Sequence, residues 1–276
     1  MEIGWIDREM SGIFQTLLLP EAAEALKQGK PLLALGLTED DVACGAATGE
    51  LQGDVFTVTS FYVAPDYRRR GGGTMLIEAL RNLLKEHCHS LEISYTVTLP
   101  EHQALAPFLT AMGFLCRPDY GETIYGVTLG SLENNSFFAR EQKIPANVRP
   151  FAQVSPTMLR EVYQAARVRE EAYLPVPLTD SSLDAAVSMA VVEDDTVRSF
   201  AAVLGRQPGL LELAWVQSGR PQDMAPMLLA AYAAARRSYP PETLLTVQAV
   251  NAASAKLLCA MLPEADPISF TYYCDL

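Results

Sequence analysis

The chain has 276 residues, of which 49% are hydrophobic and 20% charged, so it can bury a sizeable core and is not predominantly disordered. Its 33 acidic and 21 basic residues give a net charge of −12, which argues against nucleic acid as a general partner because a phosphate backbone needs a basic surface. The same charge is compatible with a cationic substrate such as an amine, and equally with solubility alone. At about 150 residues per domain, the length favours two domains.

The sequence gives no sign of export, membrane insertion or metal binding. The chain has no apolar run of about 18 residues, and its start lacks a basic segment followed by an apolar one. Five cysteines without a CxxC pair argue against a disulfide framework, so we expect a cytoplasmic protein. We expect Cys44 and Cys116 in the core, and no metal at His87-Cys88-His89 because adjacent residues rarely converge on one ion.

Predicted helices and strands alternate along the first 130 residues. Proline, glycine and acidic clusters mark their ends, and the leucines of the central helix recur at 3.6-residue spacing. In chain order we predict helices at 8–18 and 20–28, a hairpin of 31–37 and 42–47, a strand at 54–63, a helix that follows residues 71–74 and ends at about 86, a strand at 91–99, a helix at 101–112, and strand-like residues from 114 and at 122–129.

The second half of the chain repeats this order of elements. Residues 131–147 are rich in loop formers, so we predict a linker there between domains at 1–130 and 148–276. The order recurs at a spacing of about 150 residues, which favours duplicated domains. The repeated elements are a hairpin at 189–203, a strand at 211–216, a helix at 224–235, a strand at 244–250 and a helix at 254–261.

The most specific motif is Arg68-x-x-Gly71-x-Gly73, placed between a predicted strand and a predicted helix. A helix N-terminus offers free N–H groups and partial positive charge to an anion, and glycines let phosphate oxygens approach the main chain. The pattern lacks the Gly-Lys-Ser/Thr of a Walker loop, and Leu76 stands where a dinucleotide fingerprint needs a small residue. The alternative is a turn whose glycines cap a helix and whose arginines are solvated.

Residues 61–76 resemble the acyl-CoA-binding signature of the GNAT N-acetyltransferases, and residues 106–114 resemble the family's following helix, which ends in Gly-Phe. The resemblance covers about residues 30–130, and 150–276 only by order of elements. It implies an α+β, sandwich-like fold of two tandem GNAT-like domains. Each domain would have a mixed, mostly antiparallel sheet flanked by helices.

The resemblance also implies a reaction. Acetyl-CoA would be the co-substrate, without a metal, and its acetyl group would pass directly to a primary amine of a small molecule or peptide within a ternary complex. The alternative is a non-catalytic acyl-CoA-sensing or scaffolding module, and a homodimer stays open. The implied acetyl-CoA-binding residues are Phe61, Tyr62, Val63, Arg68, Arg69, Arg70, Gly71, Gly72, Gly73 and Thr74.

Two departures from the family affect the catalytic residues. Leu109 stands where the family commonly has a tyrosine that protonates the departing thiolate, and leucine cannot donate a proton. His102 stands where the family often has an asparagine; it is a candidate base, CoA contact or helix-start residue. Other candidates are Tyr62, Tyr120 and Tyr125 as proton donors, and Glu50, Asp54 and Glu92 as bases.

The second copy lacks the glycine motif. Counting from Val216 as from Val63, Met224 and Pro226 stand at the positions of the first and last glycines. Proline removes an N–H group and methionine blocks close approach. We therefore predict a degenerate copy that does not bind pyrophosphate in the same way and that shapes the acceptor cleft or an oligomer interface.

Overall fold

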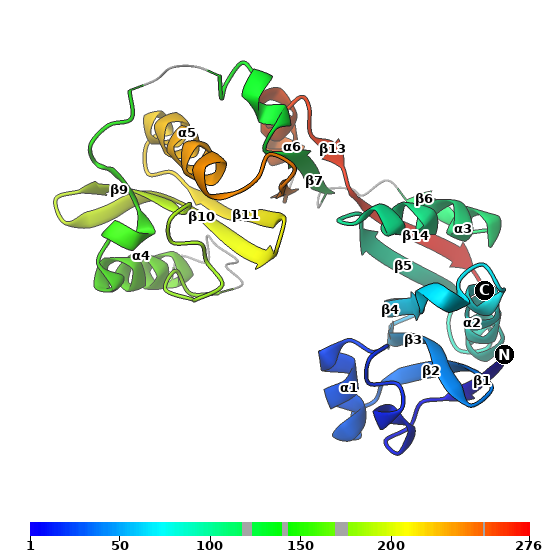
Figure 1. Cartoon of the computed structure of the whole chain (residues 1–276). Helices are drawn as coiled ribbons and strands as arrows, with labels where there is room; N and C mark the ends of the chain where they lie inside the picture. Colours follow the sequence, from blue (N-terminus) through cyan, green and yellow to red (C-terminus); the bar gives the residue numbers. More distant parts are fainter. Residues whose placement is uncertain (118–122, 140–142, 169–175, 251) are drawn as a thin grey trace. The chain divides into compact units, whose positions relative to one another are not determined.

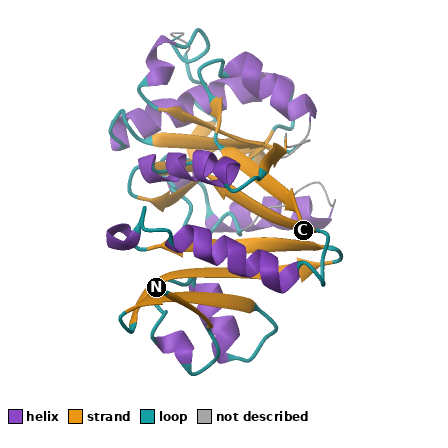
Figure 2. Ribbon diagram, turned by 90° about the vertical axis from the view of Figure 1, so that its right-hand side faces the viewer, coloured by secondary structure: helices purple, strands orange, loops and turns teal. Residues whose placement is uncertain are grey.

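The computed structural model describes residues 1–117, 123–139, 143–168, 176–250 and 252–276, which form two compact units (Figure 1). Unit 1 comprises Met1–Asp119 and Ser269–Leu276, and unit 2 comprises Tyr120–Ile268. Within the described residues each unit contains a seven-stranded mixed sheet with helices packed on it (Figure 2). The predicted α+β fold in two tandem copies is confirmed.

In unit 1 the strands lie in the order β1-β2-β3-β4-β5-β14-β6. The β4–β5 pair is parallel and the other neighbouring pairs are antiparallel. The elements are β1 (Glu2–Trp5), η1 (Met10–Gly12), α1 (Pro20–Lys27), β2 (Leu33–Glu39), β3 (Val42–Gln52), β4 (Val55–Val63), η2 (Pro65–Tyr67), α2 (Gly72–Leu84), β5 (Ser90–Thr96), η3 (Pro100–Ala104), α3 (Leu105–Ala111), β6 (Leu115–Arg117) and β14 (Ser269–Asp275).

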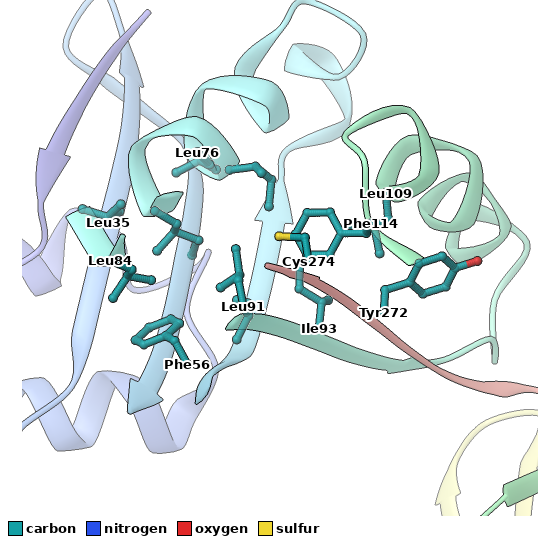
Figure 3. Packing of buried hydrophobic residues seen from close by; sticks show 14 of the residues in the cluster. Leu35, Phe56, Leu76, Leu84, Leu91, Ile93, Leu109, Phe114, Tyr272 and Cys274 are labelled. Atoms are coloured by element: carbon teal, nitrogen blue, oxygen red, sulfur yellow. The ribbon is translucent and has the colours of Figure 1, made fainter. Parts of the chain in front are cut away.

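The main core of unit 1 lies between this sheet and α2. Leu76, Ile77 and Leu80 are fully buried because their spacing places them on one face of the helix. Burying each such side chain contributes about 1.5–3 kcal/mol. Tyr272 and Cys274 of β14 complete this core beside α3 (Figure 3). A smaller core on the opposite side joins α1 and η1 to the alternate side chains of β2 and β3.

Three expectations for unit 1 need correction. The helix expected at 8–18 is a 3-10 turn, because the Asp7 carboxylate accepts the backbone N–H groups of Glu9 and Met10 and stabilises a turn there. The helix expected at 101–112 is divided into η3 and α3. Cys44 is buried as expected, whereas Cys116 is exposed, because it lies in β6 at the edge of the sheet.

In unit 2 the strands lie in the order β13-β7-β12-β11-β10-β9-β8. Here α5 packs on one face of the sheet and α4 on the other, each over its own apolar cluster. The elements are β7 (Thr123–Thr128), η4 (Ser131–Asn134), β8 (Val148–Pro150), η5 (Phe151–Gln153), α4 (Pro156–Val168), β9 (Met189–Glu193), β10 (Thr196–Gln207), β11 (Leu210–Gln217), α5 (Pro221–Ser238), β12 (Leu244–Ala249), α6 (Ala252–Met261) and β13 (Asp266–Pro267).

The two units share details of the backbone, which supports duplication. The acidic hairpin turns have positive φ at both central residues, Asp40 and Asp41 in unit 1, Asp194 and Asp195 in unit 2. This is the turn geometry that matches the twist of a hairpin. In each unit the strand that follows this hairpin pairs in parallel with the next strand along the chain: β4 with β5, and β11 with β12.

The two units exchange a strand relative to the expected boundaries. β7 pairs with β12 in unit 2, and β14, at the end of the chain, pairs with β5 and β6 in unit 1. The structure thus divides the chain near residues 119 and 268 rather than at 130 and 147. Part of the expected linker packs within unit 2, since Leu132 of η4 is fully buried and Asn135 donates hydrogen bonds to Met261 and Glu264.

Candidate functional site

The sheet of unit 1 opens between β4 and β5. The two strands pair only over Val55–Val58 and Ser90–Ile93, although both continue. A β-bulge places Thr59 as an extra residue in β4, because Thr48 pairs with Ser60 and the next residue of β3 pairs with Val58. A bulge bends its strand and increases the twist. Residues 61–63 therefore remain paired with β3 but have no strand partner on the β5 side.

The glycine motif forms the turn that starts α2. Gly71 is the N-cap residue with φ of 89°, a left-handed conformation that glycine adopts without steric cost. The first four N–H groups of a helix have no partner within it, here those of residues 71–74. Among the described residues, no acceptor forms a hydrogen bond with any of these four N–H groups. Free N–H groups and the positive end of a helix dipole are features that suit an anion, and here they lie next to the end of β4.

The three glycines have different neighbours. A Cβ atom at Gly71 would meet nothing within 4 Å, whereas one at Gly72 would lie 2.5 Å from the Leu37 side chain. A Cβ atom at Gly73 would lie 3.2 Å from the Phe108 ring of α3, which stacks on Phe61 with 5.9 Å between ring centroids. Gly72 therefore permits close packing on β2, and Gly73 keeps the space beside the open strand clear.

The three arginines of the motif lie on the loop before α2 and are exposed. Arg68 donates from Nε to the Val63 carbonyl (2.9 Å), and its guanidinium lies over the Tyr62 ring. Arg70 forms an ion pair with Glu39 (2.8 Å). Arg69 has a positive φ of 59° and no ion pair within the described chain. The positive charge available to an anion at the helix start therefore comes mainly from Arg68 and Arg69.

The structure separates the predicted catalytic residues. Tyr62 lies on the open part of β4 and is partly exposed. His102 lies in η3, with Nδ1 3.1 Å from the Thr96 carbonyl oxygen, so its ring is held against the end of β5. Leu109 is fully buried in the core of unit 1. Tyr120 lies outside the described residues.

Of the remaining candidates, one belongs to unit 2, and the two carboxylates lie away from the glycine turn within unit 1. Tyr125 is in β7 of unit 2, and a hydrogen bond with Cys259 and burial raise the pKa of its hydroxyl. Glu50 pairs with Thr57 at the closed end of the β4–β5 pair, and Glu92 forms an ion pair with Arg117 at the same level. Five residues of extended chain separate that level from Tyr62, a distance of about 16 Å.

One residue that the sequence did not single out is Tyr95. It lies on β5 beyond the last residue that pairs with β4. Its hydroxyl is buried, with no hydrogen-bond partner of ordinary geometry among the described residues, and burial raises its pKa to about 12. The phenol thus stays protonated at neutral pH. Only the tertiary structure reveals it, because the neighbouring Tyr272 comes from β14.

Unit 2 has the same open sheet without the anion site. β11 and β12 pair only over Leu210–Leu213 and Leu244–Val247, and Ala214 forms the matching bulge. However, α5 begins at Pro221, directly after residues 218–220, whereas residues 64–71 precede α2. Met224 and Pro226 therefore lie within the helix and not in a loop before it.

A carboxylate occupies the start of α5. Asp223, in the first turn, accepts two hydrogen bonds from Arg198 (2.8 Å each) and one from Ser199 (2.7 Å). Arg198 also contacts Glu193, which pairs with Arg220 (3.3 Å). These hydrogen bonds, chiefly that of Arg198, hold the pKa of the Asp223 carboxyl below its ordinary value. A diphosphate at this helix start would meet two carboxylates.

Among the described residues, no group of three or more histidine, cysteine and acidic side chains could hold a metal ion. In the same part of the chain no helix is long and apolar enough to cross a membrane.

A mixed sheet that opens beside a glycine-rich helix start is the architecture of an acyl-CoA N-acyltransferase, and unit 2 repeats it without the glycines. The sequence model of the Acetyltransferase (GNAT) family matches residues 4–114. In sequence, residues 4–114 are therefore similar to the GNAT acetyltransferases, and the whole chain has the fold of a tandem GNAT protein.

The structural similarity extends over both units. A tandem GNAT protein from the clavulanic acid biosynthesis pathway is 17% identical and gives a TM-score of 0.55, with 99% of this chain and 98% of that chain covered. A GCN5-related N-acetyltransferase from Sphaerobacter thermophilus is 16% identical with a TM-score of 0.49, covering 98% and 91%. No curated protein matches the chain in sequence.

Proposed function

We propose that unit 1 binds acetyl-CoA and transfers its acetyl group to a primary amine of a small molecule or peptide. The observation that carries the proposal is the geometry of residues 61–74. An open strand with unpaired backbone groups ends beside a helix start whose amides and arginines suit a diphosphate. The family match supports acyl transfer as the chemistry.

Backbone groups would hold the co-substrate. The unpaired edge of residues 61–63 suits the amides of a pantetheine arm, which would add to β4 as a further strand. One N–H group of this edge would polarise the thioester carbonyl and stabilise the oxyanion that forms there. Arg68 and Arg69, together with the amides of residues 71–74, would hold the diphosphate.

In the transfer step the amine nitrogen attacks the thioester carbonyl carbon, a C–N bond forms and the C–S bond breaks. The ammonium must first lose a proton, and the thiolate then gains one. A thiol with a pKa near 8.5 leaves without strong acid assistance, so Leu109 does not exclude the reaction. The tyrosines of unit 1 that could supply the proton are Tyr62 on β4 and Tyr95 on β5.

The substitution Gly73→Val tests the acetyl-CoA site. Its side chain would enter the space beside Phe61 and Phe108, so we expect the affinity for acetyl-CoA to fall by at least about tenfold in calorimetry. Gly12→Val is the control, because a Cβ atom there meets nothing within 4 Å and the residue lies in η1. Equal affinity in the two variants would contradict the site.

The substitutions Tyr62→Phe and Tyr95→Phe identify the proton donor. Loss of the donor should lower kcat about tenfold or more, with an unchanged Kd for acetyl-CoA, because proton transfer to the thiolate affects only the chemical step. The deficit should shrink as the pH rises above the pKa of the thiol. If neither variant changes kcat or its pH profile, water protonates the thiolate.

The second candidate function is a non-catalytic sensor of acyl-CoA, which the buried Leu109 favours. Thiol release measured against a panel of small amines and peptides distinguishes the two. Tight binding of acetyl-CoA without turnover on any amine supports the sensor, and turnover on one of them supports the transferase.

A further inference from the structure

Unit 2 contains an apolar cavity of about 380 Å³ at its open sheet. Its walls come from β11, α5, β12 and α6, the counterparts of β4, α2, β5 and α3 in unit 1. Trp215, Leu228, Leu245 and Met261 represent these four walls. None of the described residues that line the cavity is charged. Protein interiors rarely leave such volumes, because empty space forfeits dispersion contacts.

The cavity reaches the surface at its rim. Val250 and Leu257 both line it, and the two residues are 62% and 50% exposed. The deeper part of the cavity lies against the buried cluster between α5 and the sheet. Leu211 and Ala231 belong to this cluster, and Leu228 packs against it. A ligand could thus enter between Val250 and Leu257 with its apolar part leading.

The chemistry of the cavity excludes a nucleotide. The start of α5 already holds Asp223, paired with Arg198, and Glu193 lies in the same network. Few polar groups face the cavity, and the Tyr232 hydroxyl among them already donates to the Leu129 carbonyl (3.2 Å). A charged group buried there would lack a partner, at a high energetic cost.

We infer that unit 2 binds the alkyl chain of a small amphiphile in this cavity, with the polar end of the ligand at the rim formed by Val250 and Leu257. A cavity of about 150 Å³ accepts a benzene molecule, so 380 Å³ accommodates a chain of about eight to twelve carbons. The site is separate from the acetyl-CoA site of unit 1 and does not depend on it.

The chain contains its own reporter for this site. Its two tryptophans are Trp5, on β1 of unit 1, and Trp215, in the cavity wall. In the full-length Trp5→Phe variant, fluorescence therefore reports on Trp215 alone. Titration with 1-hexanol, 1-octanol and 1-decanol should give a saturable change in emission. The affinity should rise about fourfold per methylene until the chain fills the cavity.

Two substitutions in the same background test the location. Ala231→Phe should fill the cavity and lower the affinity for 1-decanol by at least about tenfold, with circular dichroism as the check of folding. Leu257→Glu places a charge at the exposed rim and should also weaken binding. Leu51→Glu is the matched control, because Leu51 is 52% exposed and lies on β3 of unit 1.

The outcomes are decisive even if Ala231→Phe does not fold, because Leu257→Glu changes an exposed residue. Weaker binding in Leu257→Glu than in Leu51→Glu, together with the rise in affinity with chain length, supports the site. An unsaturable response, affinities independent of chain length, or equal affinities in the two glutamate variants would overturn it. Acetyl-CoA binding by the same variants should be unchanged and shows whether unit 1 is intact.

Discussion

At the scale of single residues, the clearest difference between the two copies is what stands at the start of the helix that follows the open sheet. Unit 1 has glycines and exposed arginines there, whereas unit 2 has Asp223 held by Arg198 and Ser199. The carboxylate satisfies the positive end of α5 from within the chain. The same position in the fold therefore has free N–H groups in one unit, where we propose a ligand anion, and a carboxylate of the chain itself in the other.

The Asp223–Arg198 pair predicts a pH dependence of unit 2. The pKa of the Asp223 carboxyl is lower in the folded than in the unfolded protein, so its stabilising effect is complete above about pH 4 and is lost as the pH falls further. Asp223→Asn should lower the stability at pH 7, and wild type and variant should converge on acidification. The slope of unfolding free energy against pH is proportional to the number of protons taken up on unfolding. Between wild type and variant this number should differ by up to about one.

Urea unfolding followed through Trp215 measures this, because in the Trp5→Phe background that residue reports on unit 2. Parallel pH profiles for the two proteins would show that Asp223 contributes nothing to the acid sensitivity of unit 2.

At the scale of elements, the bulge in β4 is what opens the sheet of unit 1. Up to Val58 the strand pairs with β5, and after Thr59 it does not. Thr59 is tied to β3 by the contact of its hydroxyl with that of Thr48 (3.0 Å). Gly49, next to Thr48, lies against the Phe56 ring. A side chain at position 49 therefore has no room where β3 and β4 pair beside the bulge.

We predict that Gly49→Ala destabilises unit 1 by about 1–3 kcal/mol, as overpacking does. The new Cβ atom would lie 2.4 Å from the Phe56 ring and 2.6 Å from the Thr57 carbonyl oxygen. Because a backbone atom is involved, rotation of Phe56 alone cannot relieve the contact. Urea unfolding monitored by circular dichroism measures the change. Gly4→Ala serves as the control, since a Cβ atom there meets nothing within 4 Å. The same loss in both variants would refute the prediction.

At the scale of the whole molecule, unit 1 takes one of its strands from the far end of the chain. β14 lies between β5 and β6, and its Tyr272 and Cys274 belong to the core of unit 1 (Figure 3). Unit 1 is therefore incomplete until the last residues of the chain are present. This makes folding of the N-terminal unit a long-range event, which is slow for topological reasons.

This topology predicts how fragments behave. A fragment of residues 1–130 should not fold, because it leaves β5 and β6 without the strand between them. A fusion of 1–117 to 269–276 through a short glycine-serine loop should fold and bind acetyl-CoA, since Arg117 already pairs with Thr271 in antiparallel register. Circular dichroism and calorimetry on the two fragments test this. Cooperative unfolding of 1–130 alone would be incompatible with the exchange.

Much of this protein could be predicted from local sequence. Alternating and 3.6-residue apolar patterns identified most strands and helices, and residues 68–74 predicted the helix start because backbone conformation there depends on the glycines themselves. The repeat of elements likewise predicted two tandem copies. The helices, the strands and the helix start each depend on residues close together in the chain.

Only the tertiary structure decided which strand belongs to which sheet. Backbone hydrogen bonds between strands are the same whatever the sequence, so nothing local assigns β7 to unit 2 or β14 to unit 1. The apolar cavity and the buried Tyr95 hydroxyl depend in the same way on side chains that are distant in the chain. The sequence by itself determined most of the elements and the glycine turn, whereas long-range packing determined which strands pair with one another.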